Sequence, residues 1–198
     1  MPEIFEPGYF FHVYNRGNNK ENVFIEEKNY SFFLELVSRH LLPISDIFCY
    51  CLMKNHFHFL LRIKDYEELP DDLFKDKNRL YQPFSNLFNA YTKAINKAYN
   101  RTGSLFQEHF HKIRVNDLAF LQHLVAYIHL NPVKHGFVED FGNYKHSSYQ
   151  SILSSSPTKL KRNEVIEFFE DKSNLVFWHD FKKIRSDGII GEIDKIDE

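Results

Sequence analysis

Two apolar runs separated by only two residues constrain the fold of this chain more than any other feature of its sequence. Residues 46–53 (DIFCYCLM) and 56–63 (HFHFLLRI) are each long enough for a buried strand, and only Lys54 and Asn55 lie between them. A two-residue link joins antiparallel neighbours, because a parallel crossover needs about a dozen residues or more. The sequence therefore predicts a β-hairpin within an antiparallel sheet.

The segments around this hairpin predict further strands and helices. The aromatic and β-branched run 8–14 is typical of a strand closed by the turn residues that follow it, and 104–115 is expected to be an extended segment leading into another strand. Apolar residues recur at helical spacing in three segments, which we expect to end near proline or glycine: 26–42, 82–100 and 116–131. We expect an α+β fold, with a central antiparallel β-sheet covered by helices on one side.

The chain of 198 residues has the length of one domain with an added segment. The run Ser154-Ser155-Ser156-Pro157 is the clearest change in composition. We therefore expect a main domain over 1–153 and a small C-terminal extension over 154–198. Within the extension, the amphipathic stretch 163–184 predicts helix, whereas 186–198 has the composition of a frayed acidic tail.

The cysteines and the N-terminus bear on where such a chain works. Cys49 and Cys51 are the only cysteines, and their spacing within an apolar strand disfavours a disulfide. No apolar run approaches the roughly 18 residues of a membrane span, and the N-terminus carries acids where a secretory signal carries bases. We expect a cytoplasmic protein with no membrane partner.

Charge is distributed unevenly along the chain. The net charge of −2 argues mildly against a nucleic-acid ligand. The segment from Lys77 to Arg114, however, contains seven basic residues and one acidic residue, whereas the segment from Glu164 to Glu198 contains ten acidic and five basic residues. The basic middle segment could follow a phosphate backbone, and a solvated helix face explains the same charges equally well.

Two histidines at the start of the second apolar run are the strongest candidates for chemistry. Because side chains alternate along a strand, His56 and His58 share one face and Phe57 points to the other. In the predicted helix 116–131, Tyr127 and Asn131 are four residues apart and also share a face. Two imidazoles facing a tyrosine suggest a metal that polarises a phosphate for attack by the hydroxyl. A chance pairing of histidines remains open, since the chain contains eleven.

Five motifs occur in an order that makes a resemblance specific. They are Tyr14-Asn15-Arg16-Gly17, the run from Tyr50 to Leu61, Gly103-Ser104-Leu105-Phe106-Gln107, the run from Tyr127 to Gly136, and Ser147-Ser148-Tyr149. Over about residues 8–150 the chain resembles the REP-associated tyrosine transposases, a branch of the single-tyrosine HUH transposases. Lys54 departs from the proline that this family usually has before its Asn-His pair.

The resemblance implies a fold and a set of roles. It implies an HUH fold of the ferredoxin or RRM-like type, with His56 and His58 as ligands of Mg²⁺ or Mn²⁺ and Tyr127 as the nucleophile. Asn131 falls where related transposases place a third, amide ligand. The implied activity is nicking and strand transfer of single-stranded DNA through a 5′-phosphotyrosine, beside hairpin-forming repeats. The candidate DNA contacts are Arg16, Lys93, Lys97, Arg101, Lys112 and Arg114.

Two other functions remain compatible with these residues. One is a domesticated protein that binds hairpin DNA without cutting it, and the other is a metal-dependent phosphodiesterase that uses water while Tyr127 is structural. Either a monomer or a homodimer is compatible with the sequence, since some HUH transposases exchange the tyrosine helix between subunits.

Overall fold

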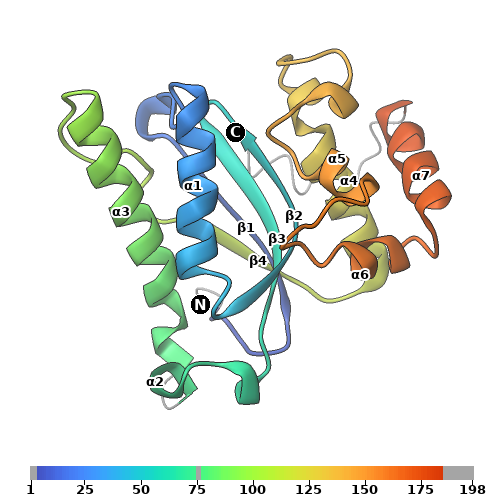
Figure 1. Ribbon diagram of the computed structural model, residues 1–198, viewed down its shortest axis with the longest axis horizontal. Helices are drawn as coiled ribbons and strands as arrows, with labels where there is room; N and C mark the ends of the chain where they lie inside the picture. The colour runs from blue at the N-terminus through green and yellow to red at the C-terminus, as the bar shows by residue number, and fades with distance from the viewer. Residues whose placement is uncertain (1–3, 75–76, 185–198) are drawn as a thin grey trace.

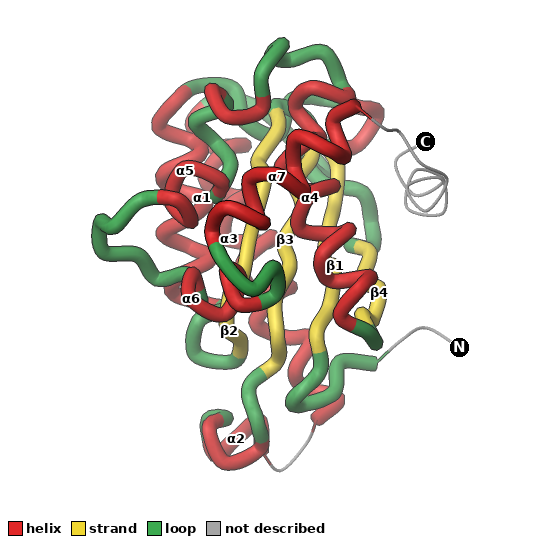
Figure 2. The backbone as a smooth tube through the Cα atoms, turned by 90° about the vertical axis from the view of Figure 1, so that its right-hand side faces the viewer, coloured by secondary structure: helices red, strands yellow, loops and turns green. Residues whose placement is uncertain are grey.

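A four-stranded antiparallel sheet forms the centre of the molecule. The computed structural model describes residues 4–74 and 77–184. Within them the strands lie in the order β2-β3-β1-β4, and every pairing is antiparallel (Figures 1 and 2). The strands are β1 (Phe10–Arg16), β2 (Ser45–Met53), β3 (His56–Ile63) and β4 (His111–Val115). The predicted hairpin is confirmed, with Lys54 and Asn55 as its turn.

One face of the sheet carries a core built largely from phenylalanine. Phe11 of β1 and the pair Phe57 and Phe59 of β3 point to this face and are at most 1% exposed. They are covered by α1 (Glu27–His40) and α3 (Gln82–Ala98), as Figure 1 shows. Phe33 of α1 packs 5.2 Å from Phe57, measured between ring centres. Burying such rings removes large apolar areas from water, which is the main stabilising contribution to folding.

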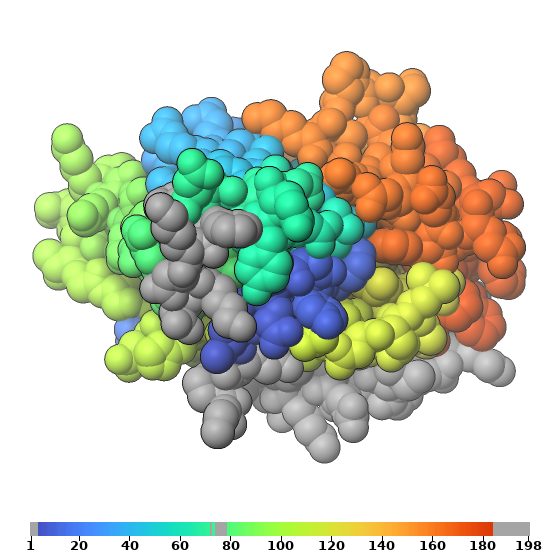
Figure 3. Space-filling view, turned by 90° about the horizontal axis from the view of Figure 1, so that it is seen from below, coloured from blue at the N-terminus to red at the C-terminus, as the bar shows by residue number. Residues whose placement is uncertain are grey.

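The opposite face is covered as well, so the expectation of helices on one side only is wrong. Here α4 (Leu118–Lys134) packs across the sheet, and the chain continues through α5 (Tyr149–Leu153), α6 (Arg162–Glu167) and α7 (Lys172–Ile184). Viewed from below, these C-terminal helices form one flank of the molecule and α3 the other, with the N-terminal segment between them (Figure 3). The α+β class is confirmed. Each face of the sheet is apolar and therefore needs a helical layer.

Several local predictions differ from the structure. The segment 65–80, expected to be a loop, contains three short helical turns: η2 (Tyr66–Glu68), α2 (Asp71–Phe74) and η3 (Lys77–Tyr81). The predicted single stretch 163–184 is divided into α6 and α7, because Glu170 adopts a positive φ of 69° that ends helical geometry. Two further short turns are η1 (Asn18–Lys20) and η4 (Phe141–Asn143).

Helix α4 also runs further than expected. Asn131-Pro132 was predicted to end it, yet the helix continues to Lys134. Both residues are buried, and the N–H of His135 donates to the carbonyl of Asn131 over 2.9 Å. Packing and this bond therefore outweigh the preference of a residue before proline for extended backbone.

Three further expectations concern the cysteines, membrane-spanning helices and the C-terminal segment. Cys49 and Cys51 are buried and free, as expected. Within residues 4–74 and 77–184 there is no helix whose length and hydropathy would let it span a membrane. The acidic segment 186–198 lies outside the described residues, and the boundary at 153/154 stays a prediction.

A buried chain of hydrogen bonds ties α7 to α4 and to the sheet. Nδ1 of His179 donates to the carbonyl of Leu175 over 2.7 Å, so Nε2 of the neutral ring is an acceptor. Nδ1 of His129 lies 2.9 Å from that atom and therefore donates to it. Nε2 of His129 then accepts from the hydroxyl of Ser148 over 2.8 Å. Both histidines are fully buried, so each bond satisfies a group that water cannot reach.

Replacing His179 with leucine should destabilise the fold. The substitution leaves the Nδ1–H of His129 buried without an acceptor, which costs about 1–3 kcal/mol in the free energy of unfolding. Urea denaturation at neutral pH measures this loss. The exposed His109 provides the control, because His109→Leu removes a histidine at the surface. Equal stability of the two variants would contradict the role assigned to this bond.

His179 should also make the free energy of unfolding depend on pH. Burial lowers the pKa of His179 from 6.5 to about 4. Between these values the unfolded chain binds a proton that the folded chain does not, so the free energy of unfolding falls as the pH falls, by at most about 1.4 kcal/mol per pH unit. In His179→Leu this contribution is absent. Its stability should therefore fall less steeply than that of the wild type between pH 6.5 and 4, and parallel curves would contradict the assignment.

Candidate active site

The hairpin directs both histidines of the His-Phe-His motif towards α4. In the β ladder, His56 lies opposite Arg16 of β1 and His58 lies opposite Tyr14. The two imidazole rings are 5.3 Å apart between centres and nearly perpendicular. They are 5% and 1% exposed. As the alternation predicts, they share one face, and Phe57 points to the other.

The turn before β3 is held tightly against the end of β1. The N–H of Gly17 donates to the carbonyl of Asn55 over 2.7 Å. A Cβ on Gly17 would lie 2.1 Å from the carbonyl oxygen of Glu21, so only glycine fits this approach. The amide oxygen of Asn55, in turn, lies 2.7 Å from Nδ1 of His56. Because that oxygen only accepts, Nδ1 carries the proton and Nε2 of the neutral ring has the lone pair.

Helix α4 carries the tyrosine and the asparagine to the histidine pair. Asp117 caps its N-terminus, with Oδ1 accepting from the N–H of Phe120 over 2.8 Å. Tyr127 is 3% exposed, and its ring meets the ring of His58 edge-on with centres 5.8 Å apart. One turn later, Nδ2 of the buried Asn131 donates to the carbonyl of Tyr127 over 2.9 Å. The structure thus brings Tyr127 to the histidine pair, and Asn131 lies one turn further along the same face of α4.

Buried acceptor atoms of His56 and Asn131 have no hydrogen-bond partner among the described residues. They are Nε2 of His56 and Oδ1 of Asn131. Leaving such atoms unsatisfied costs free energy, and a bound cation would satisfy both. Within the described ranges, no three His, Cys, Asp or Glu side chains form a metal-binding group. A cation here would therefore need an amide oxygen beside the two imidazoles, and Asn131 offers one.

The surroundings of the histidines are positively charged. Burial, together with the charges of the neighbouring His135, Arg16 and Lys134, lowers the pKa of His56 to about 3. Burial likewise holds the pKa of His58 well below its ordinary value, so both rings are neutral near pH 7, as metal ligands must be. No acidic group contributes to either shift. A site with this charge favours an anion such as a phosphate.

The sequence analysis missed several residues of this site. His12 of β1 is 1% exposed, and its Nε2 lies 3.0 Å from Nδ1 of His58. The ring of His135 lies 4.8 Å from that of His56, and Nζ of Lys134 lies 5.2 Å from the centre of the Tyr127 ring. For His135 and Lys134 the sequence does carry a signal, because both follow the Asn131-Pro132 pair within three residues. No sequence signal assigns His12, because its neighbours depend on strand order.

The six candidate DNA contacts lie in different surroundings. Arg16 is next to the histidines, and Lys93 and Lys97 are exposed on α3. Arg101 forms an ion pair with Glu21. The remaining two lie on β4: Lys112 above the rings of Phe5, Tyr81 and Phe110, and Arg114 against Tyr9 and Glu6. Their roles as DNA contacts stay predictions.

A polar groove of about 460 Å³ lies between α3 and the segment before β4. Its walls carry amide and hydroxyl side chains, the cation Lys93 and aromatic rings; they include Asn15, Asn89, Thr92, Asn96, Gln107, Tyr81 and Phe88. Asn15 lies beside Arg16 at the end of β1 where β3 begins. The groove thus lies at the same end of the sheet as His56, on the side of the face that carries Phe57.

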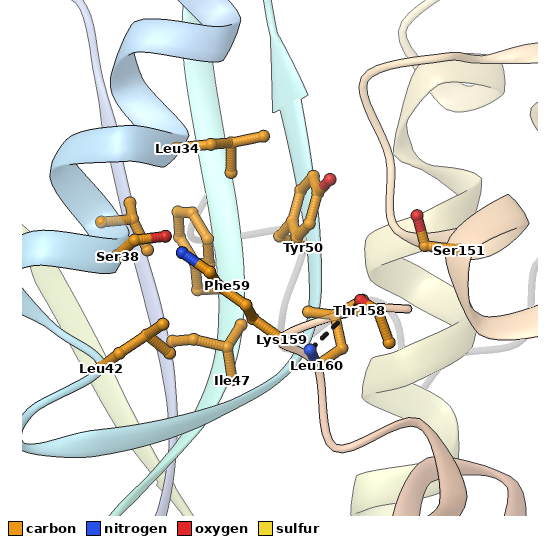
Figure 4. A pocket seen from close by; sticks show the side chains of 11 residues that line it. Leu34, Ser38, Leu42, Ile47, Tyr50, Phe59, Ser151, Thr158, Lys159 and Leu160 are labelled. Atoms are coloured by element: carbon orange, nitrogen blue, oxygen red, sulfur yellow. Dashed lines mark hydrogen bonds between the residues drawn. The ribbon is translucent and has the colours of Figure 1, made fainter. Parts of the chain in front are cut away.

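A second, apolar cavity is unrelated to this site. It has a volume of about 190 Å³ and lies between α1, β2 and the segment Thr158–Leu160 (Figure 4). Leu34, Leu42, Ile47 and Phe59 line it, and within its lining the N–H of Leu160 donates to Thr158 Oγ1 over 3.2 Å. None of the four candidate catalytic residues lines it.

Comparison with known proteins identifies the architecture. No family model and no curated protein matches the sequence. Among solved structures, the chain is similar to a REP-associated tyrosine transposase bound to a REP hairpin, with a TM-score of 0.61 and 16% identity. The alignment covers 79% of this chain and 87% of that one. The chain therefore has the fold of this transposase.

Proposed function

We propose that the protein is a transposase of the single-tyrosine HUH type, which nicks single-stranded DNA and transfers strands. The observation that carries this proposal is the edge-on approach of the Tyr127 ring to the His58 ring, 5.8 Å between centres. A phenol, two neutral imidazoles and a buried amide oxygen thus come from two facing elements. The shared fold with a hairpin-bound transposase supports the same assignment.

A divalent cation would be held by His56, His58 and Asn131. The orphaned acceptors His56 Nε2 and Asn131 Oδ1 support this ligand set. Imidazole and amide donors suit Mn²⁺ better than the harder Mg²⁺. A bound ion would neutralise charge on a non-bridging phosphate oxygen and orient the scissile phosphate.

The tyrosine would perform the covalent step. Oη of Tyr127 attacks phosphorus, an O–P bond forms, and the bond from phosphorus to the 3′-oxygen breaks, which leaves a 5′-phosphotyrosine and a free 3′-hydroxyl. Because the energy of the phosphodiester is kept in the new bond, a 3′-hydroxyl of another strand can reverse the step. Strand transfer therefore needs no nucleotide cofactor.

The DNA substrate is proposed from charge and shape. The solved neighbour is bound to a REP hairpin, and we propose hairpin-forming single strands for this chain. Arg16 and Lys134 lie beside the histidines, where they would contact the scissile phosphate. The α3 groove, whose lining includes Lys93, Glu108 and several aromatic rings, suits the adjoining nucleotides.

We propose that the site acts within one chain. Tyr127 and His58 of the same chain are in ring contact, which supports catalysis without exchange of α4 between subunits. We also propose residues 1–153 as the catalytic domain and 154–198 as an extension. The packing of α7 on α4 supports a direct structural role for that extension.

A covalent-trapping assay with Tyr127→Phe tests the proposal. Labelled single-stranded hairpin oligonucleotides and Mn²⁺ should give a protein–DNA adduct on a denaturing gel, and the variant should give none, because it lacks the attacking oxygen. His56→Ala with the native fold should also lose the adduct. The label that remains in the adduct identifies the side of the cut that is held.

The same gel separates the alternatives. Cleavage that persists in Tyr127→Phe would overturn the tyrosine mechanism and indicate a phosphodiesterase that uses water. Tight binding without cleavage, across a panel of hairpins, would indicate a DNA-binding protein that does not cut.

Replacing Lys134 should slow the covalent step. Its Nζ lies 5.2 Å from the centre of the Tyr127 ring, where a cation favours the charged phenolate over the neutral phenol. We expect Lys134→Met to lower the rate of adduct formation about tenfold near pH 7, because the variant loses a cation beside the ring that carries the attacking oxygen. Lys134→Arg keeps the charge and should stay closer to the wild type. An unchanged rate in Lys134→Met would contradict this role.

A further inference from the structure

His12 is a buried histidine to which the covalent step assigns no role. It lies near the middle of β1, and Nε2 of its ring is 3.0 Å from Nδ1 of His58. The two rings are almost parallel, with centres 5.2 Å apart and an interplanar angle of 18°. His12 lies opposite Leu60, one position along the sheet face from the pair Tyr14 and His58. Strand pairing therefore holds this contact in place.

We infer that His12 positions His58 as a metal ligand, by accepting the hydrogen bond from Nδ1–H of His58. This inference rests on the proposed metal site. His12 itself does not touch the metal, because its Nε2 faces the nitrogen of His58 that points away from the proposed ion.

The argument depends on the two tautomers of a neutral imidazole. If the proton of His58 is on Nδ1, the lone pair is on Nε2 and that atom can bind a metal. If His12 donates instead, the proton of His58 lies on Nε2 and blocks coordination. A metal bound through Nε2 of His58 therefore requires His12 to be the acceptor. Ligand histidines usually donate their second N–H in this way.

His56, the neighbouring proposed ligand, is also oriented by a hydrogen bond from its Nδ1–H, and the acceptor comes from the turn before β3. Nδ1 of His56 donates to the amide oxygen of Asn55 over 2.7 Å. The turn thus orients His56, and β1 orients His58. Both acceptors are uncharged, so the ion would keep its full charge for a phosphate, whereas a carboxylate in either place would repel that phosphate.

Metal binding and tautomer measurement test this inference on the full chain. Binding of Mn²⁺ is followed by the loss of the electron paramagnetic resonance signal of the free ion. We expect His12→Phe, which removes the acceptor and keeps a ring, to weaken binding about 10–100-fold. His12→Gln restores an acceptor oxygen and should bind more tightly than His12→Phe. The control is His111→Phe on the same sheet face, whose ring packs on Tyr14 with centres 4.8 Å apart, and it should bind as the wild type does.

Ring ¹⁵N shifts of His58 in the metal-free protein provide the second readout. The inference predicts the Nδ1–H tautomer in the wild type and a mixture of tautomers in His12→Phe. A wild-type ring protonated on Nε2 would overturn the inference, whatever the variants do. So would a folded His12→Phe that binds Mn²⁺ as tightly as the wild type, or equal losses in the phenylalanine and glutamine variants.

Failure of the proposed function gives a different pattern. If the wild type itself does not bind Mn²⁺, both the metal site and the role of His12 in it are overturned. If the wild type binds Mn²⁺ and forms the adduct while His12→Phe does so equally, the inference about His12 alone is overturned.

Discussion

In β3 every second side chain points to the opposite face of the sheet, and the candidate site depends on this alternation. Phe57 and Phe59 enter the core under α1 and α3, so His56 and His58 must face α4. A shift of one residue would place the two phenylalanines under α4 and the histidines in an apolar core. The short turn and the bond from Gly17 to Asn55 hold the register. The apolar packing of one face thus determines the chemistry of the other.

Helix α4 connects this face to the C-terminal helices. Tyr127 and Asn131 face the sheet, while His129, on the opposite side of the helix, is bonded to His179 of α7 and to Ser148. Most of the helix is therefore buried on two sides, which fits its apolar sequence. One imidazole–imidazole bond lies on each side of α4, between His12 and His58 and between His129 and His179. Tyr127, which we propose as the nucleophile, is 3% exposed in this packing and would need little reorganisation before it attacks.

Local patterns predicted some features well and others poorly. The ends of β2 and β3 were placed within one residue, because a two-residue turn between apolar runs allows few alternatives. The face shared by His56 and His58 followed from strand periodicity alone. The basic run did not predict ion pairing: Arg101 and Arg114 are paired with acids from distant parts of the chain, and sequence spacing carries no information on such pairs. Local patterns did not predict that helices cover both faces of the sheet, because they do not show on which face α4 packs.

The sequence by itself determined the hairpin, the α+β class, and the pairing of His56 with His58 and of Tyr127 with Asn131, because these follow from periods of two and 3.6 residues. Tertiary structure decided which residues complete the group. His12 reaches His58 only because β1 lies between β3 and β4, and His179 reaches His129 only because α7 folds back on α4. Contacts between distant segments depend on strand order and helix packing, which no local period encodes.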